Sequence, residues 1–216
     1  MPHVAVVIGG GTLDPAAVAS LPDDMVVIAA DGGLDHAVEA GLAPSILVGD
    51  LDSITAGGRM WAYANGVDIR EFPTDKDLTD TELALATALA LPEAGNLVLL
   101  GGRDAADARP DHHLGTLLAL GHPALGAFGA ITANLGGSWY TVVHPDRPTR
   151  LPLGLGRTFS VFALHGPASG VRVHGARWDL DDAALSATEA RGVSNESVAD
   201  VVTVSTAVGV VTVVVP

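Results

Sequence analysis

The stretch Ile46-Leu47-Val48-Gly49-Asp50-Leu51-Asp52-Ser53 joins a short apolar run to a loop that carries two carboxylates. The apolar run is typical of a buried strand, and residues 56–65 beyond the loop have the pattern of an amphipathic helix. A strand followed by a turn and a helix is the repeating unit of α/β sheets. The stretch therefore predicts an α/β fold with acidic side chains at the end of a strand.

The same unit recurs over the first two thirds of the chain. The sequence predicts strands at residues 4–8, 25–30, 45–48, 67–72 and 96–100, and helices at residues 34–40, 56–65, 81–91 and 112–120. This alternation predicts a mainly parallel, Rossmann-like sheet with helices on its faces. The loops after the strands would then share the carboxyl edge, where open α/β sheets bind ligands.

The pattern changes at the Pro-rich stretch His144-Pro145-Asp146-Arg147-Pro148. Beyond it, segments of β character are separated by Gly, Pro and Asp, at residues 159–164, 170–174, 201–205 and 210–215. Short strands with such turns predict a small antiparallel β-sandwich. We therefore expect an α/β domain over residues 1–145 and a β-sandwich domain over residues 146–216.

The composition excludes several classes of protein. The 216 residues include no Cys, which excludes disulfides, thiolate catalysis and Cys-ligated zinc. A formal net charge of −14 argues against nucleic-acid binding, because the phosphate backbone needs a basic surface. It does not exclude a nucleotide that arrives paired with Mg²⁺. The N-terminal run lacks the features of a signal peptide and the C-terminal run is too short to span a bilayer, so we expect a cytoplasmic protein without membrane contact.

A second acidic cluster is Thr74-Asp75-Lys76-Asp77-Leu78-Thr79-Asp80-Thr81-Glu82. Carboxylates that are close together repel one another, so a fold that gathers them usually does so around a cation. Mg²⁺ prefers such oxygen ligands. Lys76 is the only lysine of the chain, and its place among these acids indicates a site where metal and lysine neutralise phosphate charge together.

Each of these motifs also has a purely structural interpretation. Thr79 and Glu82 fit a capping box for the following helix, although that role does not explain Lys76. Asp50 and Asp52 would project to one side of an extended segment and share an ion, but Gly-Asp and Asp-Ser are also ordinary turn chemistry.

Two glycine-containing loops are less specific. Asp31-Gly32-Gly33 could bring backbone N–H groups to a phosphate and Asp31 to a ribose or an ion, or it could simply be a tight strand-to-helix turn. Gly9-Gly10-Gly11-Thr12 lacks the spacing of a dinucleotide fingerprint and the ending of a P-loop.

Three further features complete the candidate set. Arg109-Pro110-Asp111-His112-His113 opens a helix; Arg109 could neutralise a transferring phosphoryl group, and Asp111 could cap the helix. Trp178 and the segment Gly192-Val193-Ser194-Asn195-Glu196 stand out in the C-terminal part, where a core tryptophan and a plain loop are the simpler interpretations.

Together these segments resemble the thiamine pyrophosphokinase family, and they follow its order from about residue 25 to the C-terminus. The matching pieces are Asp31-Gly32-Gly33, residues 44–54, residues 76–85, Arg109 to Leu114, and Gly192 to Glu196. The chain departs from the family at residues 103–108, which separate Gly101-Gly102 from the arginine motif, and at His113 and Thr116, where Thr and Asn are usual. Arg109 is favoured over Arg103 as the family arginine because of its spacing to Asp111 and His112.

The resemblance implies a Mg²⁺-dependent thiamine diphosphokinase that converts ATP and thiamine into AMP and thiamine diphosphate. It implies a homodimer whose active sites lie between subunits. It assigns catalytic roles to Asp50, Asp52, Lys76, Asp77, Asp80, Arg109, Asp111 and His112, with the four aspartates at 50, 52, 77 and 80 as metal ligands. Asp31, Gly32, Gly33 and Thr79 would lie at the ATP side, and Trp178, Ser194 and Asn195 would contact thiamine.

Two other functions remain open at this point. One is the same diphosphoryl transfer to a hydroxymethylpterin, since related catalytic domains use that acceptor. The other is a nucleotide- or metal-binding regulator without turnover.

Overall fold

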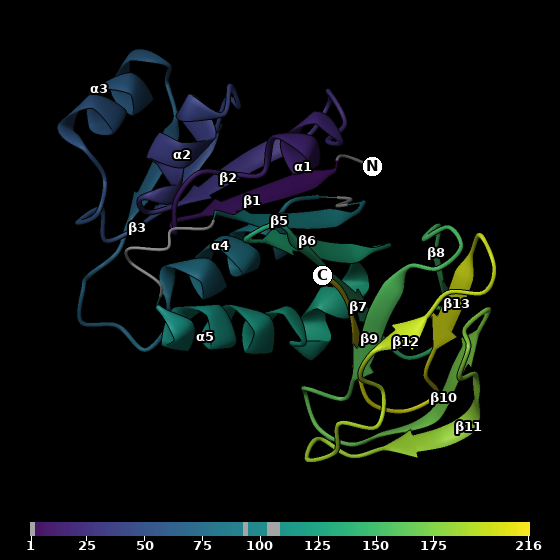
Figure 1. Cartoon of the computed structure of the whole chain (residues 1–216). Coiled ribbons are helices and arrows are strands. Elements are labelled where there is room, and N and C mark those ends of the chain that lie inside the picture. Colours follow the sequence, from purple (N-terminus) through teal and green to yellow (C-terminus); the bar gives the residue numbers. More distant parts are fainter. Residues whose placement is uncertain (1–2, 93–94, 103–108) are drawn as a thin grey trace. The chain divides into compact units, whose positions relative to one another are not determined.

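The computed structural model describes residues 3–92, 95–102 and 109–216 (Figure 1). The chain divides into two compact units. The first unit comprises Met1–Ala119 and Ala127–Gly137, and the second comprises Leu120–Gly126 and Ser138–Pro216. The domain boundary between residues 145 and 146 stays a prediction.

The first unit alternates strands and helices, as the sequence predicts (Figure 1). Its elements are β1 (Val4–Ile8), α1 (Pro15–Ala19), β2 (Val26–Ala30), α2 (Gly33–Glu39), β3 (Ile46–Gly49), α3 (Ala56–Ala64), β4 (Asp68–Glu71), α4 (Asp80–Leu89), β5 (Leu97–Gly101), α5 (Pro110–Leu120) and β6 (Ile131–Leu135). The strand order is β6-β5-β1-β2-β3-β4, and all of these neighbours pair in parallel. The order reverses at β1, which creates a topological switch point.

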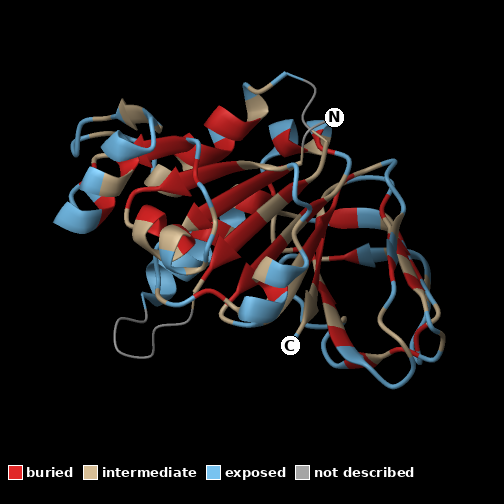
Figure 2. Ribbon diagram, turned by 90° about the horizontal axis from the view of Figure 1, so that it is seen from above, coloured by how far each residue is buried: buried red, intermediate tan, exposed pale blue. Residues whose placement is uncertain are grey.

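The centre of this sheet is covered on both faces, as parallel sheets require. The strands at the centre of the sheet are mostly buried (red in Figure 2), and the residues of β1 from Val4 to Val7 are fully buried. α4 packs on β1, β2 and β3, and α2 packs on β1 and β2. A Cβ atom at Gly33 would lie 2.2 Å from the Val7 carbonyl oxygen, so glycine is what lets α2 begin against β1.

The second unit is the β-sandwich that the sequence predicts. Its first layer consists of four strands that are neighbours in the order β12-β9-β14-β7, part of a ten-stranded sheet, and its second layer is a sheet with the order β11-β10-β13-β8. The strands are β7 (Ser138–Val143), β8 (Thr149–Leu151), β9 (Thr158–Phe162), β10 (Ala168–His174), β11 (Leu180–Leu185), β12 (Asn195–Glu196), β13 (Val202–Ser205) and β14 (Val211–Val215). Phe159, Val161 and Val213 of the first sheet share one buried core with Val171 and Val204 of the second.

The sequence pattern does not predict seven of the elements, of which β8 and β12 are the shortest strands. The seven are α1, η1 (Pro123–Ala127), β6, β7, β8, β11 and β12. β11 is an edge strand with exposed aspartates at positions 181 and 182, so it lacks the apolar alternation on which strand prediction depends. Among the described residues, no helix combines the length and the apolar character that crossing a bilayer requires.

Candidate active site

The acidic side chains gather where the parallel strands of the first unit end. Asp31 directly follows β2, and Asp50 directly follows β3. Ala30 of β2 pairs with Val48 of β3, so the two loops leave neighbouring strands at the same edge. This is the carboxyl edge, where open α/β sheets bind ligands.

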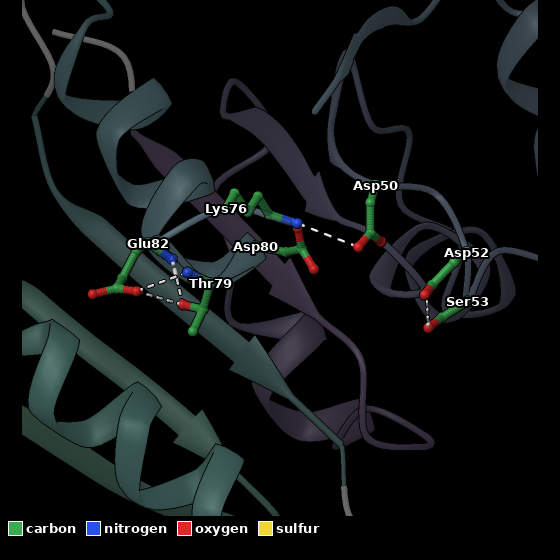
Figure 3. Close-up of polar contacts among 7 residues, drawn as sticks. All are labelled: Asp50, Asp52, Ser53, Lys76, Thr79, Asp80 and Glu82. Atoms are coloured by element: carbon green, nitrogen blue, oxygen red, sulfur yellow. Dashed lines mark hydrogen bonds and ion pairs between the residues drawn. The ribbon is translucent and has the colours of Figure 1, made fainter. Parts of the chain in front are cut away.

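Lys76 joins the two acidic clusters (Figure 3). Its Nζ atom lies 3.3 Å from Oδ2 of Asp50 and 3.1 Å from Oδ1 of Asp80. The Lys76 side chain is only 15% exposed and that of Asp50 only 10%. Burial opposes the charge on Lys76, but hydrogen bonds to Asp80 and Asp50 outweigh it and raise the pKa of Lys76. Burial likewise opposes the charge on Asp50, but the hydrogen bond from Lys76 and other bonds lower its pKa.

Three carboxylates form a group suited to a metal ion. Asp31, Asp50 and Asp52 each offer an oxygen, and these atoms all lie within 4.8 Å of one another. Oδ1 of Asp31 is buried and has no hydrogen-bond partner within the described ranges. Burial, with a contribution from the charge of Asp80, raises the pKa of Asp31. An orphaned buried carboxylate oxygen beside two others fits a hard cation such as Mg²⁺.

The metal loop, which we define as residues 50–55, has the turn rather than the extended geometry, the two interpretations that its sequence allows. β3 ends at Gly49, and Leu51 has a left-handed backbone with φ of 63°. The Leu51 side chain is buried, so Asp50 and Asp52 lie on either side of an anchored residue. At Gly49, a Cβ atom would lie 3.0 Å from Asp31 Cβ and 3.2 Å from Asp80 Oδ1, so glycine allows the three loops to meet.

The remaining members of the second cluster have different surroundings. Thr79 is the N-cap of α4, and it forms the predicted capping box with Glu82. Asp77 is exposed, and neither Asp77 nor Asp80 belongs to the group of three carboxylates found among the described residues. The roles of Asp77, Asp80 and Thr79 toward metal and ATP therefore stay predictions. Gly32 is the N-cap of α2 and has no side chain to cap it.

Arg109 and Asp111 bind each other at the start of α5. Nε and Nη2 of Arg109 donate to the two carboxylate oxygens of Asp111 at 3.0 and 2.7 Å. This bond holds the pKa of Asp111 well below its usual range. Both side chains are about three-fifths exposed (61% and 62%), and His112 is exposed as well. Arg103 and the rest of residues 103–108 lie outside the described residues.

The second unit presents Trp178 at its surface and fixes its backbone. Oδ1 of Asn195 accepts from the Trp178 backbone N–H at 3.2 Å, and Nδ2 donates to the Trp178 carbonyl at 2.9 Å. Asn195 is buried, whereas the Trp178 side chain is 58% exposed. The guanidinium of Arg177 lies 5.1 Å from the centre of the Trp178 ring. Ser194 is exposed and has a left-handed backbone.

Both units match one family. Residues 20–125 match the catalytic domain of thiamin pyrophosphokinase, and residues 142–211 match its vitamin B1 binding domain. The chain belongs to the thiamine pyrophosphokinase family. It is therefore an enzyme with thiamine diphosphokinase activity, and the match to a vitamin B1 binding domain selects thiamine over a pterin as acceptor. Membership of this enzyme family also decides against the alternative of a regulator without turnover.

Solved thiamine pyrophosphokinases share this fold over most of their length. The enzyme from Bacillus subtilis is 20% identical with a TM-score of 0.78, and the comparison covers 99% of this chain and 98% of that one. A family protein from Enterococcus faecalis is 22% identical with a TM-score of 0.74, covering 100% and 98% of the two chains. The enzyme from Candida albicans is 12% identical with a TM-score of 0.76, covering 99% and 89%. A sequence comparison with curated proteins yields no match.

Proposed function

We propose that this enzyme uses ATP as donor and holds Mg²⁺ at Asp31, Asp50 and Asp52. The single observation that carries the metal site is the convergence of three carboxylate oxygens within 4.8 Å beside a buried, unpartnered Asp31 oxygen. The family resemblance supports Asp50 and Asp52 as ligands, whereas it places Asp31 at the ATP side, so the geometry alone adds Asp31 to the set. Asp77 and Asp80 would act through water molecules at the edge of the group.

In the proposed reaction, the thiamine hydroxyl oxygen forms a bond to the β-phosphorus of ATP. The bond from that phosphorus to the oxygen bridging the α- and β-phosphates breaks, and AMP leaves. The hydroxyl proton passes to a carboxylate of the cluster. Such phosphoryl chemistry depends on alignment and charge stabilisation rather than on covalent catalysis. Bound Mg²⁺ supplies positive charge to the phosphate oxygens.

The cationic side chains complete the charge balance. Lys76 is held between Asp50 and Asp80, so it lies ready to bind phosphate oxygens once those carboxylates engage a metal. Arg109 exchanges its exposed partner Asp111 for a phosphate oxygen, and Asp111 and His112 then orient neighbouring groups. The nucleotide would lie against the backbone of Gly32 and Gly33 and against the start of α4 at Thr79.

Thiamine would bind to the second unit. Its cationic ring stacks on Trp178, whose face attracts positive charge, and Ser194 hydrogen-bonds the aminopyrimidine. Asn195 supports this surface indirectly, because its amide is already bound to the Trp178 backbone. We propose a cytoplasmic homodimer in which the second unit of one subunit serves the first unit of its partner.

Substitution of Asp50 tests the metal site. Asp50→Asn should lower AMP formation from thiamine and ATP by about 10³-fold, because one metal ligand and the Lys76 partner are lost together. Asp68→Asn is the matched control, since Asp68 is an exposed carboxylate paired with Arg70 on β4. An Asp50→Asn enzyme that turns over like the control would contradict the proposal.

A further inference from the structure

Arg59 of α3 reaches the backbone of the metal loop. Its Nη2 donates to the carbonyl oxygen of Leu51 at 2.9 Å. Leu51 is the residue between Asp50 and Asp52, and its backbone is in the left-handed region that L-residues avoid. A conformation of this kind persists only where its surroundings enforce it. The hydrogen bond from Arg59 and the burial of the Leu51 side chain are two such constraints.

Asp35 of α2 holds the other end of the same loop. Its Oδ2 accepts from the Thr55 backbone N–H at 2.8 Å, and its Oδ1 accepts from the Thr55 hydroxyl at 2.6 Å. The Thr55 hydroxyl in turn accepts from the Gly58 N–H and caps α3. A Cβ atom at position 58 would lie 2.1 Å from Asp35 Oδ1, so glycine is required for this approach.

These contacts oppose a repulsion that is built into the site. The oxygens of Asp31, Asp50 and Asp52 lie close together, and their mutual repulsion would spread the loop apart in the absence of a cation. A loop that is already fixed loses less conformational freedom when a ligand binds, so its affinity is higher. Arg59 fixes the loop at Leu51, between the two acidic residues, and Asp35 fixes it at Thr55, where the loop ends.

We propose that Arg59 and Asp35 are positioning residues that hold the metal loop in its binding geometry before the cation arrives. Neither residue touches the metal, the substrate or the reacting atoms in this scheme. The inference rests on the proposed metal site and adds how that site is kept formed. Loss of either residue should weaken metal binding and leave the chemistry at saturating metal nearly unchanged.

The test is a titration of the full-length chain with Mn²⁺, with free Mn²⁺ followed by electron paramagnetic resonance. Arg59→Met and Asp35→Asn should each weaken Mn²⁺ binding by about 5- to 30-fold, the size of effect expected when one hydrogen bond that holds the loop is lost. Arg59→Lys should recover most of the affinity, because an ammonium group can still donate to the Leu51 carbonyl. The matched controls are Arg70→Met and Asp68→Asn, which remove the pair on β4.

Activity assays at varied Mg²⁺ separate positioning from a general loss of structure. The variants should need 5- to 30-fold more Mg²⁺ for half-maximal rate and reach a kcat within about twofold of the unaltered enzyme. A lowered kcat with unchanged Mg²⁺ dependence would overturn the inference, as would unchanged Mn²⁺ affinity in both variants. Failure of the unaltered chain to bind Mn²⁺ would overturn the proposed metal site and this inference with it. If Arg59→Met does not fold, Arg59→Lys and Asp35→Asn still decide the outcome.

Discussion

The ammonium nitrogen of Lys76 lies 3.3 Å from Oδ2 of Asp50, across 26 residues of sequence. The contact ties the loop after β3 to the segment that leads into α4. In the metal-free chain this single positive charge offsets part of the repulsion among the surrounding carboxylates. In the proposed reaction the same charge also binds phosphate oxygens, so we propose both a structural and a catalytic role for Lys76.

Removal of the Lys76 charge should lower the activity strongly. Lys76→Met should lower kcat/KM for ATP by about 10²- to 10³-fold, because a preorganised charge is lost from the site. Lys76→Arg should keep part of the activity. Arg70→Met, which removes an exposed cation from β4, should behave like the unaltered enzyme in the same steady-state assay. Equal activity of Lys76→Met and Arg70→Met would refute the role of Lys76.

The Asp31 carboxylate should lower the stability of the metal-free fold while it serves the proposed metal site. Its folded-state pKa is raised by burial above the unfolded value, so the folded chain loses stability as pH rises from the unfolded pKa through the folded pKa. Asp31→Asn should therefore raise the Tm of the metal-free protein at neutral pH, by about 2–4 °C, while abolishing turnover. The gain should vanish in acid, where the carboxyl is protonated in both states.

Thermal unfolding with and without Mg²⁺ checks this prediction. Mg²⁺ should raise the Tm of the unaltered chain, because a ligand of the folded state stabilises it, and should have little effect on Asp31→Asn. Asp52→Asn is the control: Asp52 is exposed, so its removal should weaken metal binding without raising the Tm. A lower Tm for metal-free Asp31→Asn would contradict the account.

Asn195 should act on thiamine through Trp178. Asn195→Ala removes two hydrogen bonds to the Trp178 backbone and should raise KM for thiamine by about 10- to 100-fold, with KM for ATP nearly unchanged. Asn65→Ala is the matched control, since Nδ2 of Asn65 donates to the Trp61 carbonyl at 2.8 Å in an exposed contact at the end of α3. An effect confined to KM for ATP would show that the thiamine surface is elsewhere.

Mixing two inactive variants tests whether subunits share active sites. In the proposed homodimer, Asp50→Asn and Trp178→Ala damage different halves of each site. Random exchange of subunits would then restore about a quarter of the sites, because half of the dimers are mixed and each of these has one undamaged site. The rate of AMP formation is measured after mixing. If no activity is recovered and the chain is a monomer by size-exclusion chromatography, the shared site is excluded.

Local features of this chain are the ones that its sequence predicts. The structure confirms the capping box of Thr79 and Glu82 and the alternation of strands and helices. Both are predictable because the first lies within four residues and the second depends on short-range periodicity. The type and spacing of Asp50 and Asp52 predict a shared ion site. Their actual geometry differs from the extended arrangement because Leu51 has a left-handed backbone and a buried side chain. No local sequence pattern predicts this conformation.

Long-range relationships could not be obtained in the same way. Asp31 joins Asp50 because β2 and β3 are neighbours in parallel register, and this follows only once the strand order is known. The bond between the Asn195 amide and the Trp178 backbone, 17 residues earlier in the chain, is a second such relationship, and contact of Asn195 with thiamine stays a prediction. Arg59 gave no signal at all, since an exposed helical arginine is unremarkable until its contact with Leu51 is seen.

The most direct test is to incubate the protein with thiamine, ATP and Mg²⁺ and to separate the products. The account predicts AMP and thiamine diphosphate in equal amounts, because one diphosphoryl group leaves ATP for each thiamine consumed. ADP with thiamine monophosphate would contradict attack at the β-phosphorus. Absence of any product would contradict the proposed activity itself.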